Sequence, residues 1–470
     1  MFDSEEEEYR DSAFYDDLER FETMIKNGSS EFFDSDRLEM MLDHFIMNNQ
    51  YRKALACVDH ALYHFPMNTT FKIRKAQVLS GGGKLNEALN LLLEVERFVQ
   101  EDQEYLLTRA SVHSQLRDSK SAVRYFEKAL AQSSGEERDE IYVDLSFEYQ
   151  ALDDYDSAIR ILTEAVSENP ENESAVYELA YCYDQKGDIE EAVKCYEVYL
   201  DFNPYSFTTW YNLGNAYSKA ENYEKAAWAY DYSILINDNF TSAYFNLANA
   251  YVSLNKFRMA IECFEKCMEL DGEDAVIVNY IAEAYEQLEE YDLALHYYRL
   301  SRELSPELPE PWLGTGIVLD LQGKENEAIH FIRKAVELEP NNPDYFHVLG
   351  GCELKVGDLE AAEVAYSKGL ALDPSNEDLL IDYIKLVAVN DLETGVERLE
   401  QFITENQLEG VSKLLLVKLY WMVGKQSDAL LLFKDLVFLR PNVAKKLFLH
   451  FEEAEMIPQF IQLYELIEEK

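Results

Sequence analysis

Residues 207–240 of this 470-residue chain read FTTWYNLGNAYSKAENYEKAAWAYDYSILINDNF. Apolar residues recur at helical spacing on both sides of the polar stretch around Glu221-Asn222. The segment therefore predicts a helix, a tight turn and a second helix. Trp210, Leu213, Gly214 and Ala226 mark places where the two helices are expected to approach each other.

The same pattern recurs along most of the chain. An alanine returns every 34 residues, with one step of 36, and the series resumes at Ala429 after Val396 interrupts it. The members before that interruption are Ala54, Ala88, Ala122, Ala158, Ala192, Ala226, Ala260, Ala294, Ala328 and Ala362.

Each recurring mark has a mechanical reason. The alanine allows close approach of two helices. Glycines five residues before it, such as Gly187 and Gly357, suit the left-handed position that ends a helix. Prolines twelve residues after it, such as Pro204 and Pro340, end the second helix. One such hairpin cannot bury both of its faces, so neighbouring hairpins must stack into a solenoid.

These residues resemble the tetratricopeptide repeat (TPR) family. The resemblance implies an all-α, right-handed superhelical solenoid of helix-turn-helix repeats. In this register twelve repeats span residues 35–443 and start at 35, 69, 103, 139, 173, 207, 241, 275, 309, 343, 377 and 410.

Two places depart from the register. Two extra residues fall near Ser133-Ser134-Gly135, and the repeat 377–409 has Ile384 and Val396 where small residues are usual. Residues 444–470 are expected to form a capping helical hairpin. Residues 1–34 are expected to be an acidic arm with one helix, which either caps the first repeat or folds onto a basic partner or the groove.

Charge and composition narrow the function. Asp and Glu number 90 against 42 Lys and Arg, a formal charge of −48. Such a surface repels phosphates, which argues against nucleic acids and anionic lipid and favours basic protein partners. The sequence shows no signal peptide or membrane span, and its six cysteines are too scattered for a disulfide framework, so a cytoplasmic location is expected.

The resemblance also implies where binding occurs, since the first helix of each repeat lines the concave surface of such solenoids. Large aromatic residues at lining positions are a sign of a binding surface, although some of them are equally well explained by packing between repeats. The predicted peptide-binding groove comprises Phe147, Tyr177, Tyr181, Tyr211, Asn212, Asn215, Phe245, Asn246, Asn249, Glu283 and Glu286.

Charged residues at the lining positions are mostly acidic, and the exceptions are Lys219, Lys355, Lys385 and Lys418, which lie toward the C-terminal end. Asn215 and Asn246 match the neutral residues of the carboxylate clamp in chaperone-binding members of the family. Tyr211, Val276 and Tyr280 occupy the places of its cations. A C-terminal carboxylate is therefore not the expected ligand.

Nothing in the sequence indicates catalysis. Gly81-Gly82-Gly83-Lys84 lacks the spacing of a phosphate-binding loop, and His60 and His64 have no evident third metal ligand. Cys57, Cys195 and Cys263 hold the same repeat position, which indicates packing. No enzyme activity, metal or cofactor is expected.

The sequence therefore predicts a scaffold that binds a partner polypeptide with apolar anchors and basic flanks, within a multiprotein complex. Two alternatives stay open. One is a co-chaperone for unfolded or basic clients, and the other is a regulatory subunit of an enzyme on another chain. A homo-oligomer also stays open.

Overall fold

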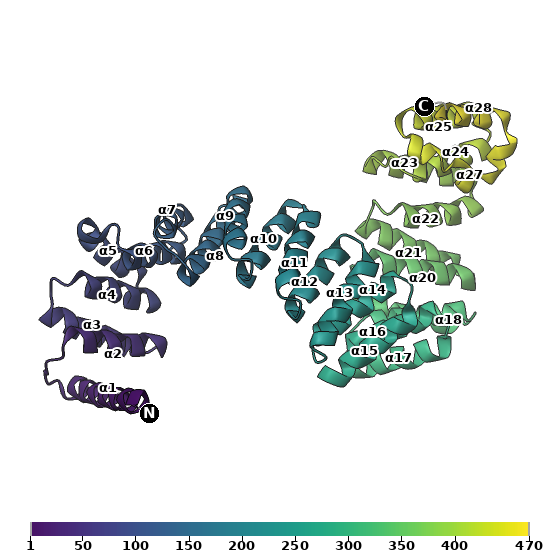
Figure 1. Ribbon diagram of the computed structural model, residues 1–470. Helices are drawn as coiled ribbons and strands as arrows, with labels where there is room; N and C mark the ends of the chain where they lie inside the picture. The colour runs from purple at the N-terminus through teal and green to yellow at the C-terminus, as the bar shows by residue number, and fades with distance from the viewer. Residues whose placement is uncertain (1, 469–470) are drawn as a thin grey trace. The chain divides into compact units, whose positions relative to one another are not determined.

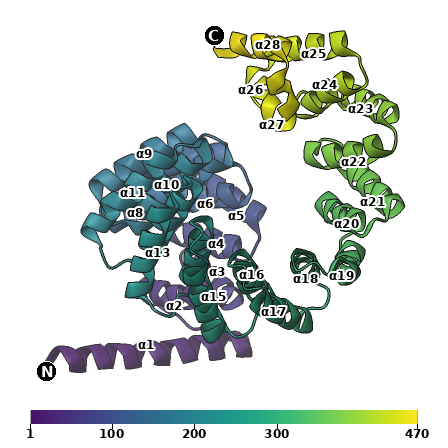
Figure 2. The same cartoon turned by 90° about the vertical axis from the view of Figure 1, so that its right-hand side faces the viewer.

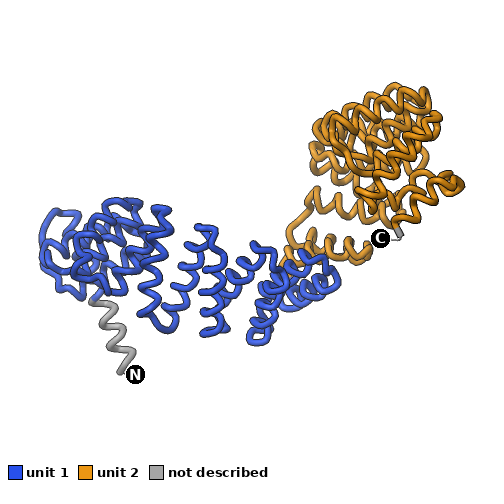
Figure 3. The backbone as a smooth tube through the Cα atoms, turned by 90° about the horizontal axis from the view of Figure 1, so that it is seen from above, with its two compact units in different colours: residues 1–238 blue, residues 239–470 orange. Residues whose placement is uncertain are grey.

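The computed structural model describes residues 2–468, and the side chains of residues 14–467. This part of the chain contains helices and no strands. It divides into two compact units, Met1–Asp238 and Asn239–Lys470, which are coloured separately in Figure 3. Each unit is described by itself.

Unit 1 begins with a long helix and continues as six helical hairpins, drawn in purple to teal in Figure 1. Helices that follow one another in the chain pack together. The helices are α1 (Phe2–Asn27), α2 (Ser35–Met47), α3 (Tyr51–His64), α4 (Thr69–Gly81), α5 (Leu85–Val99), α6 (Gln103–Gln115), α7 (Ser119–Leu130), α8 (Glu136–Ala151), α9 (Tyr155–Glu168), α10 (Glu173–Lys186), α11 (Ile189–Phe202), α12 (Phe207–Lys219) and α13 (Tyr223–Ile236).

Unit 2 continues the hairpins and ends in shorter elements. Figure 2 shows α18 to α23 following one another toward the C-terminal group. The helices are α14 (Thr241–Ser253), α15 (Phe257–Asp271), α16 (Ala275–Gln287), α17 (Tyr291–Leu304), α18 (Glu310–Leu321), α19 (Glu325–Leu338), α20 (Pro343–Val356), α21 (Leu359–Leu372), α22 (Glu377–Asn390), α23 (Leu392–Asn406), α24 (Ser412–Met422), α25 (Gln426–Leu439), α26 (Pro441–Ala444), α27 (Leu447–His450), the 3-10 helix η1 (Glu452–Met456) and α28 (Pro458–Glu468).

The predicted fold class is confirmed. The first helices of the hairpins begin at the predicted repeat starts, or within three residues of them. The largest offset is at α8, which starts at Glu136 instead of residue 139. Gly135, with φ of 65°, ends the lengthened turn there, and acidic residues fill the first helical turn, where the helix dipole favours them.

The repeat alanines are buried where the two helices of a hairpin meet, as Ala226 and Ala294 illustrate. A second close contact lies beside them. A Cβ added to Gly214 would come within 2.5 Å of the Tyr230 ring, because α12 and α13 pack backbone against ring at that point. Small residues on the first helix and a large ring on the second therefore fix the spacing of the hairpin.

The turn inside each regular hairpin contains one left-handed residue, five positions before the repeat alanine. Glycine was predicted there and occurs in five turns, for example at Gly187. Six other turns place a non-glycine residue in the same conformation, with φ between 55° and 60°. These residues are Asn49, Arg117, Asp153, Glu221, Asn255 and Glu289.

The irregular repeat 377–409 is still a helical hairpin, but its turn is a single extended residue, Asp391. Val396 is buried in the alanine's place. The close approach moves to Gly395, where an added Cβ would lie 2.9 Å from the Cβ of Ala388. The tight contact is thus kept by a neighbouring small residue.

The C-terminal segment differs from the expected two-helix hairpin. The single-turn helices α26 and α27 and the short η1 lead into one longer helix, α28. Pro458 stands at the start of α28, and the residue before it, Ile457, is extended. Proline disfavours helix at the preceding residue, which sets the start of α28, the second helix of the expected pair. The short elements α26, α27 and η1 take the place of the first. Phe451 and Phe460 of this segment are buried, with 5.7 Å between their ring centroids.

The N-terminal helix α1 packs against the first repeat. Phe21 is fully buried and lies edge-on to Phe33, 5.8 Å between ring centroids. Met24 is also buried, whereas Ile25 is 40% exposed. Lys53 of α3 and Glu22 of α1 form an ion pair of 2.7 Å across this contact.

Candidate functional site: an acidic hollow in unit 2

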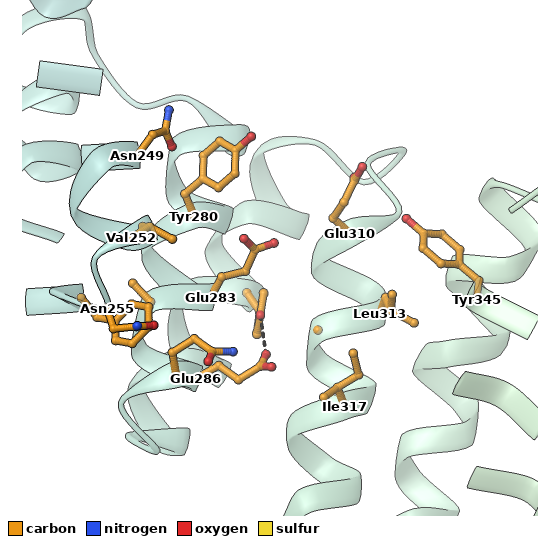
Figure 4. Close-up of a pocket in the computed structure, with 15 residues that line it drawn as sticks. Asn249, Val252, Asn255, Tyr280, Glu283, Glu286, Glu310, Leu313, Ile317 and Tyr345 are labelled. Atoms are coloured by element: carbon orange, nitrogen blue, oxygen red, sulfur yellow. Dashed lines mark hydrogen bonds between the residues drawn. The ribbon is translucent and has the colours of Figure 1, made fainter. Parts of the chain in front are cut away.

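A hollow of about 560 Å³ lies in unit 2 and is lined mainly by the first helices of four successive repeats, α14, α16, α18 and α20 (Figure 4). Its lining residues are Asn249, Val252, Asn255, Phe257, Tyr280, Glu283, Ala284, Glu286, Gln287, Tyr298, Glu310, Leu313, Gly314, Ile317 and Tyr345. The hollow thus includes the predicted residues Asn249, Glu283 and Glu286.

Three glutamates give the hollow its charge, and no Lys or Arg is among its lining residues. Asn279 donates a hydrogen bond of 2.7 Å to Glu283, and Tyr298 donates one of 2.6 Å to Glu286. Burial by the walls of the hollow raises the pKa of both carboxyls. The Glu283 side chain is exposed to solvent on one side, while the walls of the hollow exclude water from the other. The nearby negative charges of Glu286 and Glu310 raise the pKa of Glu283 further.

Apolar side chains also line the hollow, and two of them come from α18. Leu313 and Ile317 are one helical turn apart, partly exposed, and face the acidic side chains of α16 in Figure 4. Charge and apolar surface are therefore available to one ligand. This combination suits a segment that carries both a cation and an apolar side chain.

Phe245 lies beside the hollow and is not among its lining residues. Its ring is half-buried between Phe264, at 5.8 Å, and Tyr280, at 5.9 Å. Tyr280 in turn stacks on Phe264 with a centroid distance of 5.5 Å and forms part of the lining. Phe245 thus supports the ring that reaches the surface.

In unit 1, the predicted aromatic residues differ in exposure. Phe147 is 47% exposed and Tyr181 is 45% exposed, on the first helices of adjacent repeats. Tyr177 is half-buried and its hydroxyl donates to Glu173, while lying 2.8 Å from Oγ1 of Thr208. Tyr177 therefore joins α10 to α12, in agreement with the packing explanation for that residue.

Tyr211, Asn212 and Asn215 are half-buried on α12. The ring of Tyr211 lies 5.9 Å from that of Tyr230, whose hydroxyl donates a hydrogen bond of 2.8 Å to Oδ1 of Asn215. That acceptor is thus already engaged within the hairpin. In unit 2, Asn246 and Asn249 are likewise half-buried on α14.

The predicted set is divided between the two units. Phe147 to Asn215 belong to unit 1, and Phe245 to Glu286 belong to unit 2. The structure brings together Asn249, Glu283 and Glu286 around one hollow. Leu313, Ile317, Tyr280 and Tyr345 were missing from the predicted site. Leu313 and Ile317 occupy the same repeat positions as other lining residues and were recognisable by that rule.

Two of the four lysines at lining positions are neutralised by acids of the preceding repeat. Lys219 pairs with Asp184 at 2.6 Å in unit 1, and Lys355 pairs with Asp320 at 2.6 Å in unit 2. Each of these exposed pairs contributes little stability. Because two of the four lysines are already paired, the other carboxylates at the lining positions outnumber the cations available to them.

The cysteines and histidines form no grouping with the spacing of a ligand set. Among the described residues, no three His, Cys, Asp or Glu side chains are arranged to hold a metal ion. Burial raises the pKa of the Cys57 and Cys182 thiols to about 12, so they are protonated at neutral pH. His60 and His64 lie 4.7 Å apart, ring to ring, and His60 packs against Phe21 of α1.

Family models of the tetratricopeptide repeat match residues 149–213, 241–274, and 103–134, 207–238 and 312–342. The chain belongs to the tetratricopeptide repeat family. These matches fall on helical hairpins of both units, so the family and the hairpin architecture agree. TPR repeats are protein-interaction modules, and the chain is accordingly built as a protein-binding scaffold.

One curated relative is similar over a short stretch. The chain is 46% identical over 54 residues to the Hsp70-Hsp90 organizing protein of Triticum aestivum, a match that spans 12% of this chain and 9% of that protein. The match therefore covers less than a tenth of the relative's length.

Solved structures of similar chains include a tetratricopeptide repeat protein from Parabacteroides merdae, 20% identical, with a TM-score of 0.42 over 53% of this chain and 98% of that one. Another is the APC/C hetero-tetramer Cut9-Hcn1, 14% identical, with a TM-score of 0.39 over 88% of this chain and 95% of that one.

No helix among the described residues is long and apolar enough to cross a bilayer.

Proposed function

We propose that this TPR protein is a non-enzymatic scaffold whose acidic hollow binds a partner polypeptide with apolar anchors and basic flanks. The observation that carries the proposal is the lining of the hollow in unit 2. Three glutamates, tyrosine rings and the aliphatic side chains of Leu313 and Ile317 surround it, without Lys or Arg among its lining residues.

The chemistry of the lining matches that ligand. A leucine or tyrosine of the partner would contact Leu313 and Ile317 and lose its hydration, which supplies affinity. A lysine or arginine beside it would meet Glu283 and Glu310. Opposite charges across an interface mainly raise the association rate and exclude acidic competitors, so the anchors determine how long the complex lasts.

The experiment is site-specific cross-linking in a native lysate. A photoreactive phenylalanine analogue replaces Leu313 in one variant of the full chain and Val364 in the control. Val364 is 52% exposed on α21 of the same unit and does not line the hollow. Mass spectrometry of the cross-linked peptides is expected to identify basic, apolar segments from position 313 only. Acidic segments, or equal products from both positions, would contradict the proposal.

A co-chaperone is the second candidate, because of the 54-residue similarity to the Hsp70-Hsp90 organizing protein. This role predicts promiscuous binding and suppression of aggregation. A heat-denatured basic client protein, mixed with the full chain, should then aggregate less at equimolar concentration. A scaffold with one partner would leave its aggregation unchanged. If the chain is a regulatory subunit, the cross-linking experiment should instead identify a single enzyme as the cross-linked partner.

A further inference from the structure

A second hollow in unit 2 has the opposite charge. It measures about 460 Å³, within the range of ordinary ligand sites, and lies between α22 and α24, with contributions from α23 and α27. Its lining residues are Ile381, Lys385, Ala388, Val389, Leu392, Leu415, Lys418, Leu419, Met422 and His450.

The hollow has an apolar lining that extends to solvent. Ile381, Leu415 and Leu419 are buried, whereas Val389 is 83% exposed and Met422 is 55% exposed. An apolar concavity that continues into exposed apolar side chains is typical of a surface that contacts another molecule. The exposed pair also widens the apolar contact beyond the hollow, as contact with a polypeptide segment requires.

The charged residues of the lining are all basic. They are Lys385 and Lys418, and no Asp or Glu lines the hollow, in a chain with 90 acidic and 42 basic residues. His450 adds a ring whose pKa is lowered by burial. Acids do lie nearby: Asp382 contacts Lys385 at 3.1 Å, and Glu453 lies 4.0 Å from Lys418. These are long or exposed pairs, which contribute little and yield readily to a competing carboxylate.

The irregular hairpin explains why the hollow occurs here. The turn between α22 and α23 is the single residue Asp391, so α23 begins at once and Leu392 becomes part of the lining. Regular turns, such as residues 220–222 between α12 and α13, separate the two helices by more residues. The departure from the repeat pattern at Val396 therefore coincides with a distinct surface.

We propose that this hollow binds an acidic amphipathic segment of a partner protein. Apolar side chains of the segment would contact Leu415 and Leu419, and its carboxylates would lie beside Lys385 and Lys418. Local charge complementarity selects this occupant, because Lys385 and Lys418 would attract the carboxylates of an acidic segment and repel a basic one. This goes beyond the acidic hollow, since the two sites would take segments of opposite charge.

The test uses the full chain and two fluorescent synthetic peptides, one with leucines at helical spacing flanked by glutamates, and one in which lysines replace the glutamates. The first variant combines Lys385→Glu with Lys418→Glu. The second combines Val389→Ser with Met422→Gln, which changes exposed side chains and leaves the core intact. The control combines Lys324→Glu with Lys334→Glu, on or beside α19 and away from the hollow.

The dissociation constant of the glutamate peptide should rise roughly tenfold or more in both variants and stay nearly unchanged in the control. The lysine peptide is expected at the acidic hollow, so its dissociation constant should not rise in either variant. Equal loss in the control, no loss in the variants, or the same rise for the lysine peptide would overturn the proposal. Sedimentation of the chain alone adds one more check. A dimer that dissociates on Val389→Ser with Met422→Gln would show that a second copy is the occupant, and would overturn it as well.

Discussion

The hydroxyl of Tyr298 on α17 donates a hydrogen bond of 2.6 Å to the carboxylate of Glu286 on α16. The same ring packs against the next repeat, since a Cβ on Gly314 would lie 2.2 Å from it. One tyrosine thus connects the core of a hairpin, the neighbouring repeat and the acidic hollow. Packing between repeats and the chemistry of the surface are joined at this residue.

Tyr298→Phe should lower the free energy of unfolding by about 1 kcal/mol, because a buried hydrogen bond is lost while the ring remains. Urea unfolding of the full chain measures this. Tyr366→Phe is the control, since the Tyr366 ring is buried at the same repeat position but packs against Gly350 of its own hairpin. An equal loss in both variants would show that the bond to Glu286 contributes nothing particular.

Two adjacent glycines on α20 should respond in opposite ways to alanine. A Cβ on Gly350 would come within 2.4 Å of the Tyr366 ring, whereas a Cβ on Gly351 meets only the Tyr366 hydroxyl at 3.8 Å. Gly350→Ala should therefore destabilise by about 1–3 kcal/mol through overpacking. Gly351→Ala should be neutral or stabilise by up to about 1 kcal/mol through helix propensity. Thermal unfolding of the two variants compares them directly.

The turns provide a stabilising prediction. Glu221 and Glu289 hold left-handed backbone conformations, with φ of 57° and 59°. Glycine adopts this conformation without the steric cost of about 1–2 kcal/mol that other residues incur. Glu221→Gly combined with Glu289→Gly should raise the unfolding temperature. The reverse change, Gly187→Glu at φ of 81°, should lower it. Scanning calorimetry distinguishes these outcomes, and a lower temperature for the double glycine variant would refute the strain argument.

Acidification should weaken binding of a basic peptide. Burial raises the pKa of Glu283 and Glu286, so they take up protons at a higher pH than exposed glutamates, whose pKa is about 4.3. The folded chain then binds more protons than the unfolded chain, and the stability linked to these two groups declines as pH rises through their folded pKa values. Calorimetric titration of a lysine-flanked leucine peptide should show affinity falling as pH drops from neutral toward that range.

The variant Glu283→Gln with Glu286→Gln should show a smaller pH dependence of that affinity. It should also gain stability relative to the parent chain at neutral pH more than in acid, because the cost of ionising the two partly desolvated carboxyls is removed. If the affinity of the variant depends on pH as strongly as that of the parent chain, the effect comes from other members of the chain's 90 acidic residues.

The sequence predicted the hairpins well because their determinants are local and repeated. The alanine series located the helix pairs, and the glycine positions located the turns, even where Arg117 or Glu289 stands instead. The C-terminal hairpin was predicted only in part: its second helix is present as α28, which starts at Pro458, but α26, α27 and η1 stand in place of a continuous first helix. Local patterns decide such a boundary only together with the backbone restriction at proline.

The candidate site was predicted less fully because it depends on contacts between repeats. Repeat position indicated that Tyr177 and Phe245 face a groove. In the structure, the Tyr177 hydroxyl is hydrogen-bonded to Thr208 of α12, and the Phe245 ring packs against Tyr280. Leu313 and Ile317 carry no aromatic signal and were overlooked for that reason. The lysine-lined hollow arises from the irregular turn at Asp391, which no repeat rule predicts.

The most direct test of the central claim is the affinity of the lysine-flanked leucine peptide for the full chain and for two triple variants. One combines Glu283→Gln, Glu286→Gln and Glu310→Gln in the hollow. The other makes the same charge change at Glu303, Glu337 and Glu360, which are exposed outside it. The account predicts a roughly tenfold or greater rise in Kd for the first variant alone, equivalent to about 1.4 kcal/mol. Equal rises in both variants, or none in the first, would contradict it.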